Sequence, residues 1–75
     1  DEHGNRVDGR NMSLDSSGCV IINTAGEGHV VAALGLRDTL VVHTASATLV
    51  APLSDAGRVR ELVELVSDRF GSEYA

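Results

Sequence analysis

Short apolar runs separated by polar turns make up the first two thirds of the chain. They cover residues 12–14, 19–22, 30–34, 39–44 and 48–51. Most are rich in β-branched residues, which lose side-chain freedom in a helix but fit a pleated strand, so each run predicts a strand. Because the runs recur about every ten residues, the economical topology pairs sequential strands across tight turns.

The last third changes to a helical period, which predicts an amphipathic helix over about residues 55–70. Ser54 or Asp55 supplies an N-cap oxygen, and Gly71 offers a positive-φ stop. Leu65 lies off the main stripe, so the helix is apolar over a broad arc and can contact a sheet and a second chain at once. The stripe itself consists of Val59, Leu62, Val63, Val66 and Phe70.

Together these patterns predict a single, mainly β domain over residues 1–75 with one C-terminal α-helix. Short strands stacked as β-helix-like rungs or a small sheet occupy about residues 6–51, and the helix caps them. A domain this small rarely obtains more than about 3–5 kcal/mol from its own core. Cys19 is the single cysteine, so no internal disulfide can help. We therefore expect a partner chain or a parent domain to complete the fold.

The composition argues against several partners and compartments. Eleven acidic side chains oppose six basic ones, for a net charge of −5, whereas nucleic acid and anionic membranes attract basic surfaces. No apolar run approaches the ~20 residues of a membrane span. A lone cysteine favours a reducing, cytoplasmic location. The start Asp1-Glu2-His3, without an initiator methionine or signal pattern, is typical of a chain processed or cut from a longer one.

Zinc-binding side chain types occur at Cys19, His29 and His43. A structural zinc site has four ligands, usually including a close pair, whereas these three are ten or more residues apart. A free cysteine on a strand is commonly a small buried hydrophobe. The sequence therefore predicts no metal ligand and places Cys19 in the core.

His43 could serve a small hydrolase only with a nucleophile such as Ser46 and an orienting acid such as Asp38 or Asp15. Such residues occur in any chain of this size, so the pattern favours a hydrogen-bonded structural histidine. The neighbouring pair Arg37-Asp38 is either an exposed turn pair or a contact between chains.

Two further features bear on small-molecule binding. The segment Gly26-Glu27-Gly28 has Val31 where a dinucleotide loop needs a third glycine, and no helix pattern opens there, so it predicts a turn. Phe70 and Tyr74 are the only aromatic residues, too few for an aromatic-lined pocket or a base-stacking platform.

Residues 35–51, GLRDTLVVHTASATLVA, resemble the C-terminal part of bacterial mannose-1-phosphate guanylyltransferases (GDP-mannose pyrophosphorylases). That family shows G-(L/V)-x-D, a hydrophobic strand, and then T-x-(D/S)-A-x-L-V. Residues 59–66 are similar to its following helix, residues 1–9 to its D-x-x-G-N-x-x-x-G opening, and residues 14–19 to its L-D-x-x-(N/G)-(C/S) turn. The sequence departs at residues 45–47, where the family often has an Asp before the Ala.

The resemblance implies a parent enzyme of GDP-mannose biosynthesis, a nucleotidyltransferase that uses magnesium to convert GTP and mannose 1-phosphate into GDP-mannose and pyrophosphate. The family's nucleotide loop and sugar motifs precede the matched region. The resemblance therefore carries no catalytic, cofactor-binding or metal residue onto this chain, and the chain itself is not expected to be catalytic.

The function expected from the resemblance is a C-terminal structural and dimerisation domain, which packs on a preceding catalytic domain and on a second subunit. The alternative is an independent self-associating interaction module. Either function predicts that Leu62→Asp abolishes folding or assembly. The residues predicted to pack are Leu40, Val42, Leu49, Val59, Leu62, Val63, Leu65, Val66 and Phe70.

Overall fold

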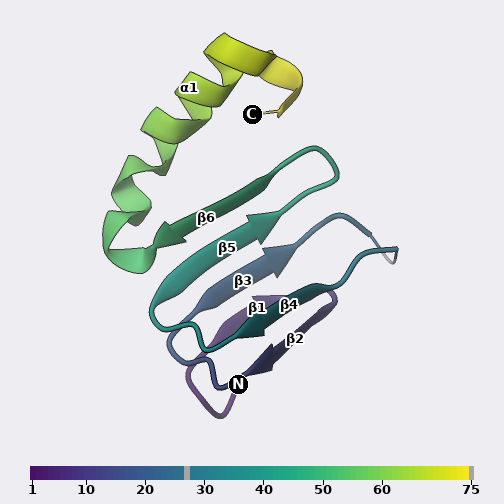
Figure 1. Ribbon diagram of the computed structural model, residues 1–75, viewed down its shortest axis with the longest axis vertical. Coiled ribbons are helices and arrows are strands. Elements are labelled where there is room, and N and C mark those ends of the chain that lie inside the picture. Colours follow the sequence, from purple (N-terminus) through teal and green to yellow (C-terminus); the bar gives the residue numbers. More distant parts are fainter. Residues whose placement is uncertain (27, 75) are drawn as a thin grey trace.

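Strands precede helices along the whole chain in the computed structural model, which describes residues 1–26 and 28–74 (Figure 1). The 3₁₀ helix η1 (Leu53–Arg58) follows the last strand, and α1 (Val59–Phe70) and the 3₁₀ helix η2 (Ser72–Tyr74) end the described part. The strands are β1 (Arg6–Asp8), β2 (Asn11–Leu14), β3 (Val20–Asn23), β4 (Val31–Leu34), β5 (Thr39–His43) and β6 (Thr48–Pro52). The predicted class, mainly β with one C-terminal helix, is confirmed.

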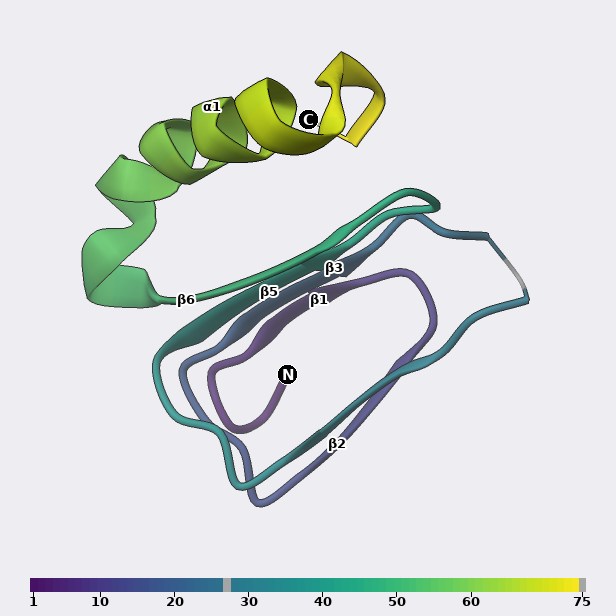
Figure 2. The same cartoon turned by 45° about the horizontal axis from the view of Figure 1, so that its top comes forward.

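The chain winds as a β-helix. Strands β1, β3 and β5 pair in parallel in one sheet, and β2 and β4 pair in parallel in a second sheet. Figure 2 shows the turns of the coil nested behind one another, with the two sheets on opposite sides. Among the described strands, only β5 and β6 form the sequential antiparallel pair that tight turns predict. The prediction of sequential pairing is therefore wrong for the other strands, whereas the β-helix-like stacking is confirmed.

The register follows a repeat of twenty residues. Val20 pairs with Leu40, and Asn11 pairs with Val31. Arg6 and Val20, by contrast, are only fourteen residues apart, so the first turn of the coil is six residues shorter. The difference lies in the connection from β3 to β4, which contains Gly26, Gly28 and Glu27; Glu27 lies outside the described residues.

The core is a narrow ladder inside the coil. Ile21 of β3 pairs with Val7 on one side and Val41 on the other, and Val50 of β6 extends the row. Ile21 and Cys19 are fully buried, whereas Val7 and Val50, at the two ends of the row, are exposed. The predicted burial of Cys19 is thus confirmed, and the core runs out at both ends of a stack this short.

Two buried asparagines fix the corners of the coil. Asn5 donates from Nδ2 to the Ser16 carbonyl over 2.9 Å and accepts from the Cys19 amide over 2.8 Å. Asn23 donates to the carbonyls of Arg10 and His29 over 2.8 and 3.1 Å. Because a parallel coil leaves backbone groups unpaired at its corners, these amides replace the missing ladder bonds.

Two local details differ from the predicted elements. Strand β1 lies at the start of the predicted strand region, but in a polar segment that contains none of the apolar runs. The helix begins later than predicted, because η1 occupies residues 53–58 and neither Ser54 nor Asp55 caps α1; its N-cap is Arg58, which makes no capping side-chain bond. Gly71 does end the helix, with φ +110°.

Within the described part, no helix has the length and apolarity needed to cross a membrane.

Candidate packing surface

The helix α1 carries an apolar stripe that the rest of the chain does not cover. All twelve of its residues are described and none is fully buried. Val59, Val63 and Val66 are half-buried, whereas Leu62, Leu65 and Phe70 are 41%, 65% and 62% exposed. Val59, Val63 and Val66, at i, i+4 and i+7, lie on the more buried flank of the helix, and the larger side chains stand at its more exposed border.

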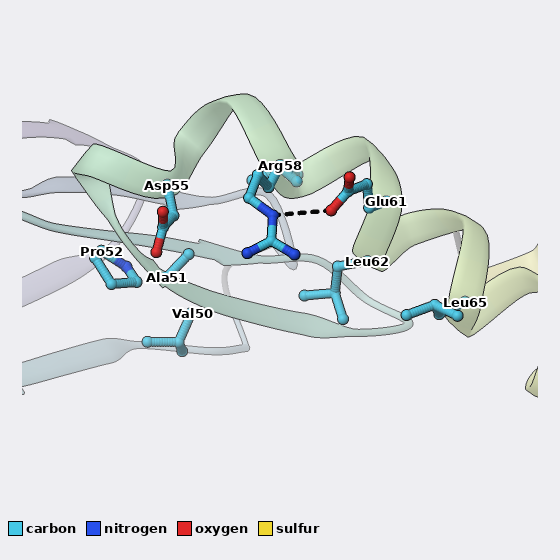
Figure 3. Close-up of a pocket in the computed structure, with 9 residues that line it drawn as sticks. Val50, Ala51, Pro52, Asp55, Arg58, Glu61, Leu62 and Leu65 are labelled. Carbon is cyan, nitrogen blue, oxygen red and sulfur yellow. Dashed lines mark hydrogen bonds and ion pairs between the residues drawn. The ribbon is translucent and has the colours of Figure 1, made fainter.

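A groove of about 240 Å³ runs between α1 and β6 (Figure 3). Its apolar lining includes Val50 and Ala51 from the strand and Leu62 and Leu65 from the helix. Arg58 and Glu61 stand on the helix side, with 2.9 Å between Arg58 Nε and Glu61 Oε2. Both side chains are well exposed, so this pair contributes little to stability. The inside of the groove is apolar, and one positive and one negative side chain, Arg58 and Glu61, stand beside it.

A second groove of about 200 Å³ lies on the other flank of Leu62. The helix contributes Leu62, Val63 and Val66, β6 contributes Thr48 and Leu49, and Ala47 and Tyr74 complete it. Since Leu62 lines both grooves, it forms the ridge between them. A partner seated here would contact this side chain from both sides.

The outer face of the main sheet continues the apolar surface. Ile21 and Val41 point into the coil, so the alternation of a strand turns Leu40 and Val42 outward. Leu40 pairs with Ala51, and Val42 pairs with Leu49. Val20 and Ile22 of β3 extend the two rows. These six side chains are half-buried. Together with the apolar residues of α1 they form what we call the sheet–helix surface.

The structure therefore brings the predicted packing residues together in two groups. Leu40, Val42 and Leu49 share one sheet face. The other six lie on α1. Phe70 is the last residue of this helix, and the guanidinium carbon of Arg69 lies 5.6 Å from the centre of the Phe70 ring. Whether these residues contact a partner stays a prediction, but they lie on neighbouring elements rather than scattered over the molecule.

A second apolar surface was missed from the sequence. Met12 and Leu14 of β2 and Ala32 and Leu34 of β4 point outward, and Met12 and Leu34 are each 70% exposed. Met12 pairs with Ala32, and Leu14 pairs with Leu34, so the four make one small patch, the β2–β4 face. The sequence does contain a sign of this surface. Residues 31–34 lie twenty residues after residues 11–14, so the twenty-residue repeat places the two segments side by side.

The side chains considered for zinc do not converge as a set. His29 and His43 meet edge to face, with ring centres 5.4 Å apart, but Cys19 lies before the start of β3 and His43 ends the parallel strand β5. Among residues 1–26 and 28–74, no group of three or more His, Cys, Asp or Glu could hold a metal ion.

The hydrolase alternative also lacks its geometry. His43 is half-buried, with 2.7 Å between its Nδ1 and the Thr48 hydroxyl across the β5–β6 pair. Asp38 precedes β5 and His43 ends it, so the two stand at opposite ends of one strand. Asp38 instead lies over Gly18, and Arg37 donates to the Ser17 hydroxyl over 3.3 Å. These contacts give His43, Arg37 and Asp38 local structural roles.

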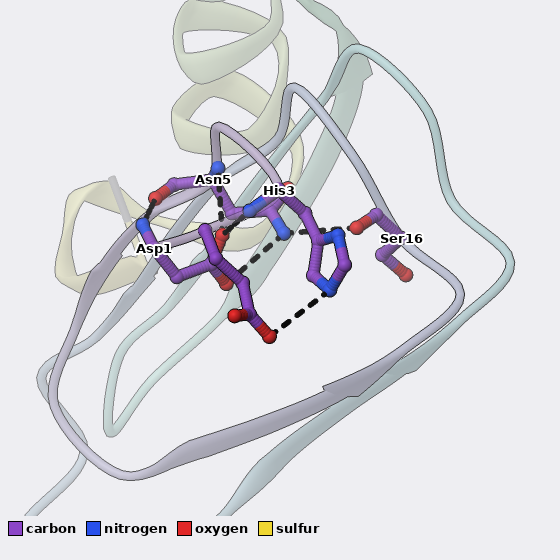
Figure 4. A network of polar contacts seen from close by, with 5 residues as sticks. Asp1, His3, Asn5 and Ser16 are labelled. Carbon is purple, nitrogen blue, oxygen red and sulfur yellow. Dashed lines mark hydrogen bonds and ion pairs between the residues drawn. The ribbon is translucent and has the colours of Figure 1, made fainter.

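A polar network closes the N-terminal end of the coil (Figure 4). The Asp1 carboxylate accepts from the amides of His3 and Asn5 over 2.9 and 3.1 Å, and Asn5 links this turn to Ser16. His3 also lies 3.4 Å from the Glu2 carboxylate. Carboxylate-to-amide bonds of this kind stabilise a turn, so the network supports the fold.

Comparison with known proteins gives two matches. Residues 9–65 match the family model described as the MannoseP isomerase/GMP-like beta-helix domain. A crystal structure described as mannose-1-phosphate geranyltransferase from Thermus thermophilus superposes with a TM-score of 0.73 and 36% sequence identity over 89% of this chain. The aligned part is 20% of that chain, so this chain spans about a fifth of the solved structure. No curated protein matches.

Proposed function

This chain belongs to the family of MannoseP isomerase/GMP-like beta-helix domains, and on that premise we propose that it is the C-terminal structural and subunit-packing domain of a mannose-1-phosphate guanylyltransferase. The parent would convert GTP and mannose 1-phosphate into GDP-mannose and pyrophosphate, with nucleotide, sugar and magnesium held by a separate catalytic domain. A cytoplasmic location belongs to the same proposal and fits the free thiol of Cys19.

The observation that carries the packing role is the exposed apolar stripe of α1. Leu65 and Phe70 are each more than three-fifths exposed, and Leu65 lines the groove beside Val50 and Ala51 of β6. Scattered apolar side chains are ordinary on a monomer, whereas a continuous apolar surface marks an interface. The stripe needs a cover that the described residues do not supply.

The size of the sheet–helix surface favours a second copy of the chain as its occupant. Three strands about 4.8 Å apart and about 16 Å long give a footprint of about 230 Å². A twelve-residue helix adds about 180 Å². The sum is about half of the roughly 800 Å² that a standard interface covers on each partner. Rim residues of both signs, such as Arg58 and Glu61, can supply the remainder of a self-complementary two-fold contact.

A substitution in the stripe tests the proposal. In the full-length protein that contains this chain, we expect Leu65→Asp to convert a dimer into a monomer, because a charge would be buried without a partner. Sedimentation velocity measures the state. Arg60→Asp is the matched control, since it introduces the same side chain at an exposed polar position of the same helix, and we expect it to leave the dimer intact.

The enzymatic half of the proposal is measured separately, as formation of GDP-mannose from GTP and mannose 1-phosphate by the same preparation. A dimer that depends on Leu65 but makes no GDP-mannose would identify the chain as an independent self-associating module. A dimer that survives Leu65→Asp would refute the assignment of the sheet–helix surface to subunit packing.

A further inference from the structure

His29 and His43 bring two imidazole rings together at one end of the coil. His29 lies in the connection from β3 to β4, and His43 is the last residue of β5. Their ring centres are 5.4 Å apart, with an angle of 61° between the ring planes. In Figure 2 the β3–β4 connection and the β5–β6 hairpin reach the same end of the coil. Neither ring belongs to the sheet–helix surface or to the β2–β4 face.

The separation of the two rings matches that of two ligands on one metal ion. Zinc binds an imidazole nitrogen at about 2.0–2.1 Å, which puts each ring centre about 3.2 Å from the metal. Two such rings at a tetrahedral angle have their centres about 5 Å apart, close to the observed 5.4 Å. The pair therefore needs side-chain rotation, and no backbone movement, to bind one ion.

The Thr48 hydroxyl prepares His43 as a ligand. The Nδ1 atom of His43 lies 2.7 Å from Thr48 Oγ1, across the β5–β6 pair. We assign the ring proton to Nδ1, because this atom then donates to the hydroxyl and the lone pair of Nε2 is left for a metal. An outer hydrogen bond of this kind fixes both the tautomer and the orientation of a metal-binding histidine.

His29 supplies the adjustable half of the pair. Its backbone carbonyl accepts from Asn23 Nδ2 over 3.1 Å, and the buried Asn23 is the β3 residue that pairs with His43. The main chain at His29 is thus fixed to the coil beside the end of β5. The His29 side chain is exposed, and exposed side chains change rotamer within nanoseconds. The His29 ring can turn toward an ion that His43 holds.

We propose that His29 and His43 form a two-histidine site for a divalent transition metal ion, with zinc as the reference ion. Imidazole nitrogen suits zinc, copper and nickel, whereas magnesium prefers oxygen ligands. Among residues 1–26 and 28–74 no third His, Cys, Asp or Glu joins the pair, so water fills the remaining positions, as at an open zinc site. The bound ion ties the β3–β4 connection to the β5–β6 hairpin. The site does not depend on the proposed function.

Chemical labelling of histidine rings in the full-length protein that contains this chain tests the site. Diethyl pyrocarbonate modifies accessible ring nitrogens, and peptide mass spectrometry assigns each modified residue. At saturating zinc chloride we expect His29 and His43 to react at least about tenfold more slowly than without metal, which corresponds to about nine-tenths occupancy. Magnesium chloride at the same concentration should protect neither ring. His3, beside Glu2 at the N-terminal end of the coil, is the internal control and should keep its rate.

Two substitutions distinguish one shared ion from two separate ones. In His43→Gln, zinc should no longer protect His29, and in His29→Gln it should no longer protect His43. Because the His29 side chain is exposed, its replacement leaves the fold intact, which circular dichroism checks. Protection of one ring that persists after the other is replaced would overturn the proposal. Equal rates with and without zinc would overturn it too, as would equal protection of His3, which marks adventitious binding to surface histidines.

Thr48→Val tests the positioning role of the hydroxyl. Valine keeps the branched shape of the side chain and removes the hydrogen-bond partner of His43 Nδ1. We expect the zinc concentration that gives half-protection of His29 and His43 to rise about tenfold. An unchanged concentration would refute the assignment of Thr48 as the residue that orients His43.

Discussion

The coil and the helix of this domain are built from the same aliphatic residues, but they bury them to different extents. Within the coil, Ile21 and Cys19 are completely buried, and the asparagines at its corners are hydrogen-bonded to the backbone. The helix α1 has no fully buried residue, and Leu65 is 65% exposed. The interior of the coil satisfies its own contacts, whereas the helix presents its contacts outward.

This difference follows from geometry. A parallel coil places equivalent residues of successive turns in register, so each inward side chain meets a neighbour above and below. Val7, Ile21 and Val41 form such a row. An amphipathic helix at the end of the stack has no further turn to cover it. The division implies that stability resides in the interior of the coil and that the helix serves mainly assembly, which substitutions can test.

The largest effect is expected at Ile21. Ile21→Ala removes three carbons from a side chain with no exposed surface and should lower the free energy of unfolding by about 2–5 kcal/mol. Chemical denaturation monitored by circular dichroism measures this. Ile22→Ala, the next residue on the outer face, is the control and should cost less than half as much. Equal losses would contradict the placement of the core inside the coil.

A smaller difference is expected between two glycines of the first turn, one of which precedes β2. Gly9 has φ +81°, and a Cβ there would lie only 2.1 Å from the Asn23 carbonyl oxygen of the next turn. Gly4 has a similar φ of +78°, with nothing within 4 Å of its Cβ position. Both Ala variants strain the backbone by about 1–2 kcal/mol. Gly9→Ala should cost about 1–3 kcal/mol more, since it also overpacks the coil.

The measurement for this pair is the same denaturation experiment on both variants. Equal stability of Gly4→Ala and Gly9→Ala would show that the first two turns of the coil are not in close contact, and so would break the contrast between a self-contained coil and an open helix.

Much of the fold could be predicted from the local pattern. The apolar runs locate β2 to β6, the helical period locates α1, and Gly71 ends it as expected. Strand β1 falls within the predicted strand region but could not be located as a separate run, because its three residues are all exposed at the end of the stack and carry no alternation. The N-cap was misplaced because residues 53–58 form a 3₁₀ helix, which local propensity does not distinguish from the first turns of an α-helix.

The pairing of the strands could not be predicted from the local hydrophobic pattern, and the reason is physical. Runs about ten residues apart suit antiparallel hairpins and alternate strands of a coil equally well. Only the twenty-residue repeat separates the two, for example Leu14-Asp15 against Leu34-Gly35, where each second residue takes a positive φ. The candidate surfaces were likewise predictable only where a single run reveals them. Leu40 and Leu49 were recognised from their runs, whereas the β2–β4 face appears only when Met12 and Ala32 are placed side by side.

The smallest effect is expected in the helix, and it sharpens the comparison because one residue type can be tested in both regions. Val41 in the coil is 7% exposed, and Val63 in α1 is half-buried beside the second groove. Val41→Ala should cost about 2–3 kcal/mol of unfolding free energy, since it removes two buried methyl groups and leaves a cavity. Val63→Ala should cost less than about 1 kcal/mol in the 75-residue chain.

In the dimer proposed above, Val63 would be covered by the second subunit, so Val63→Ala should weaken the dimer more than it destabilises the isolated chain. Thermal melting of the 75-residue chain and sedimentation of the full-length protein give the two quantities. If Val63→Ala destabilises the short chain as much as Val41→Ala does, then α1 is part of the core, and the division between a self-sufficient coil and an outward-facing helix is wrong.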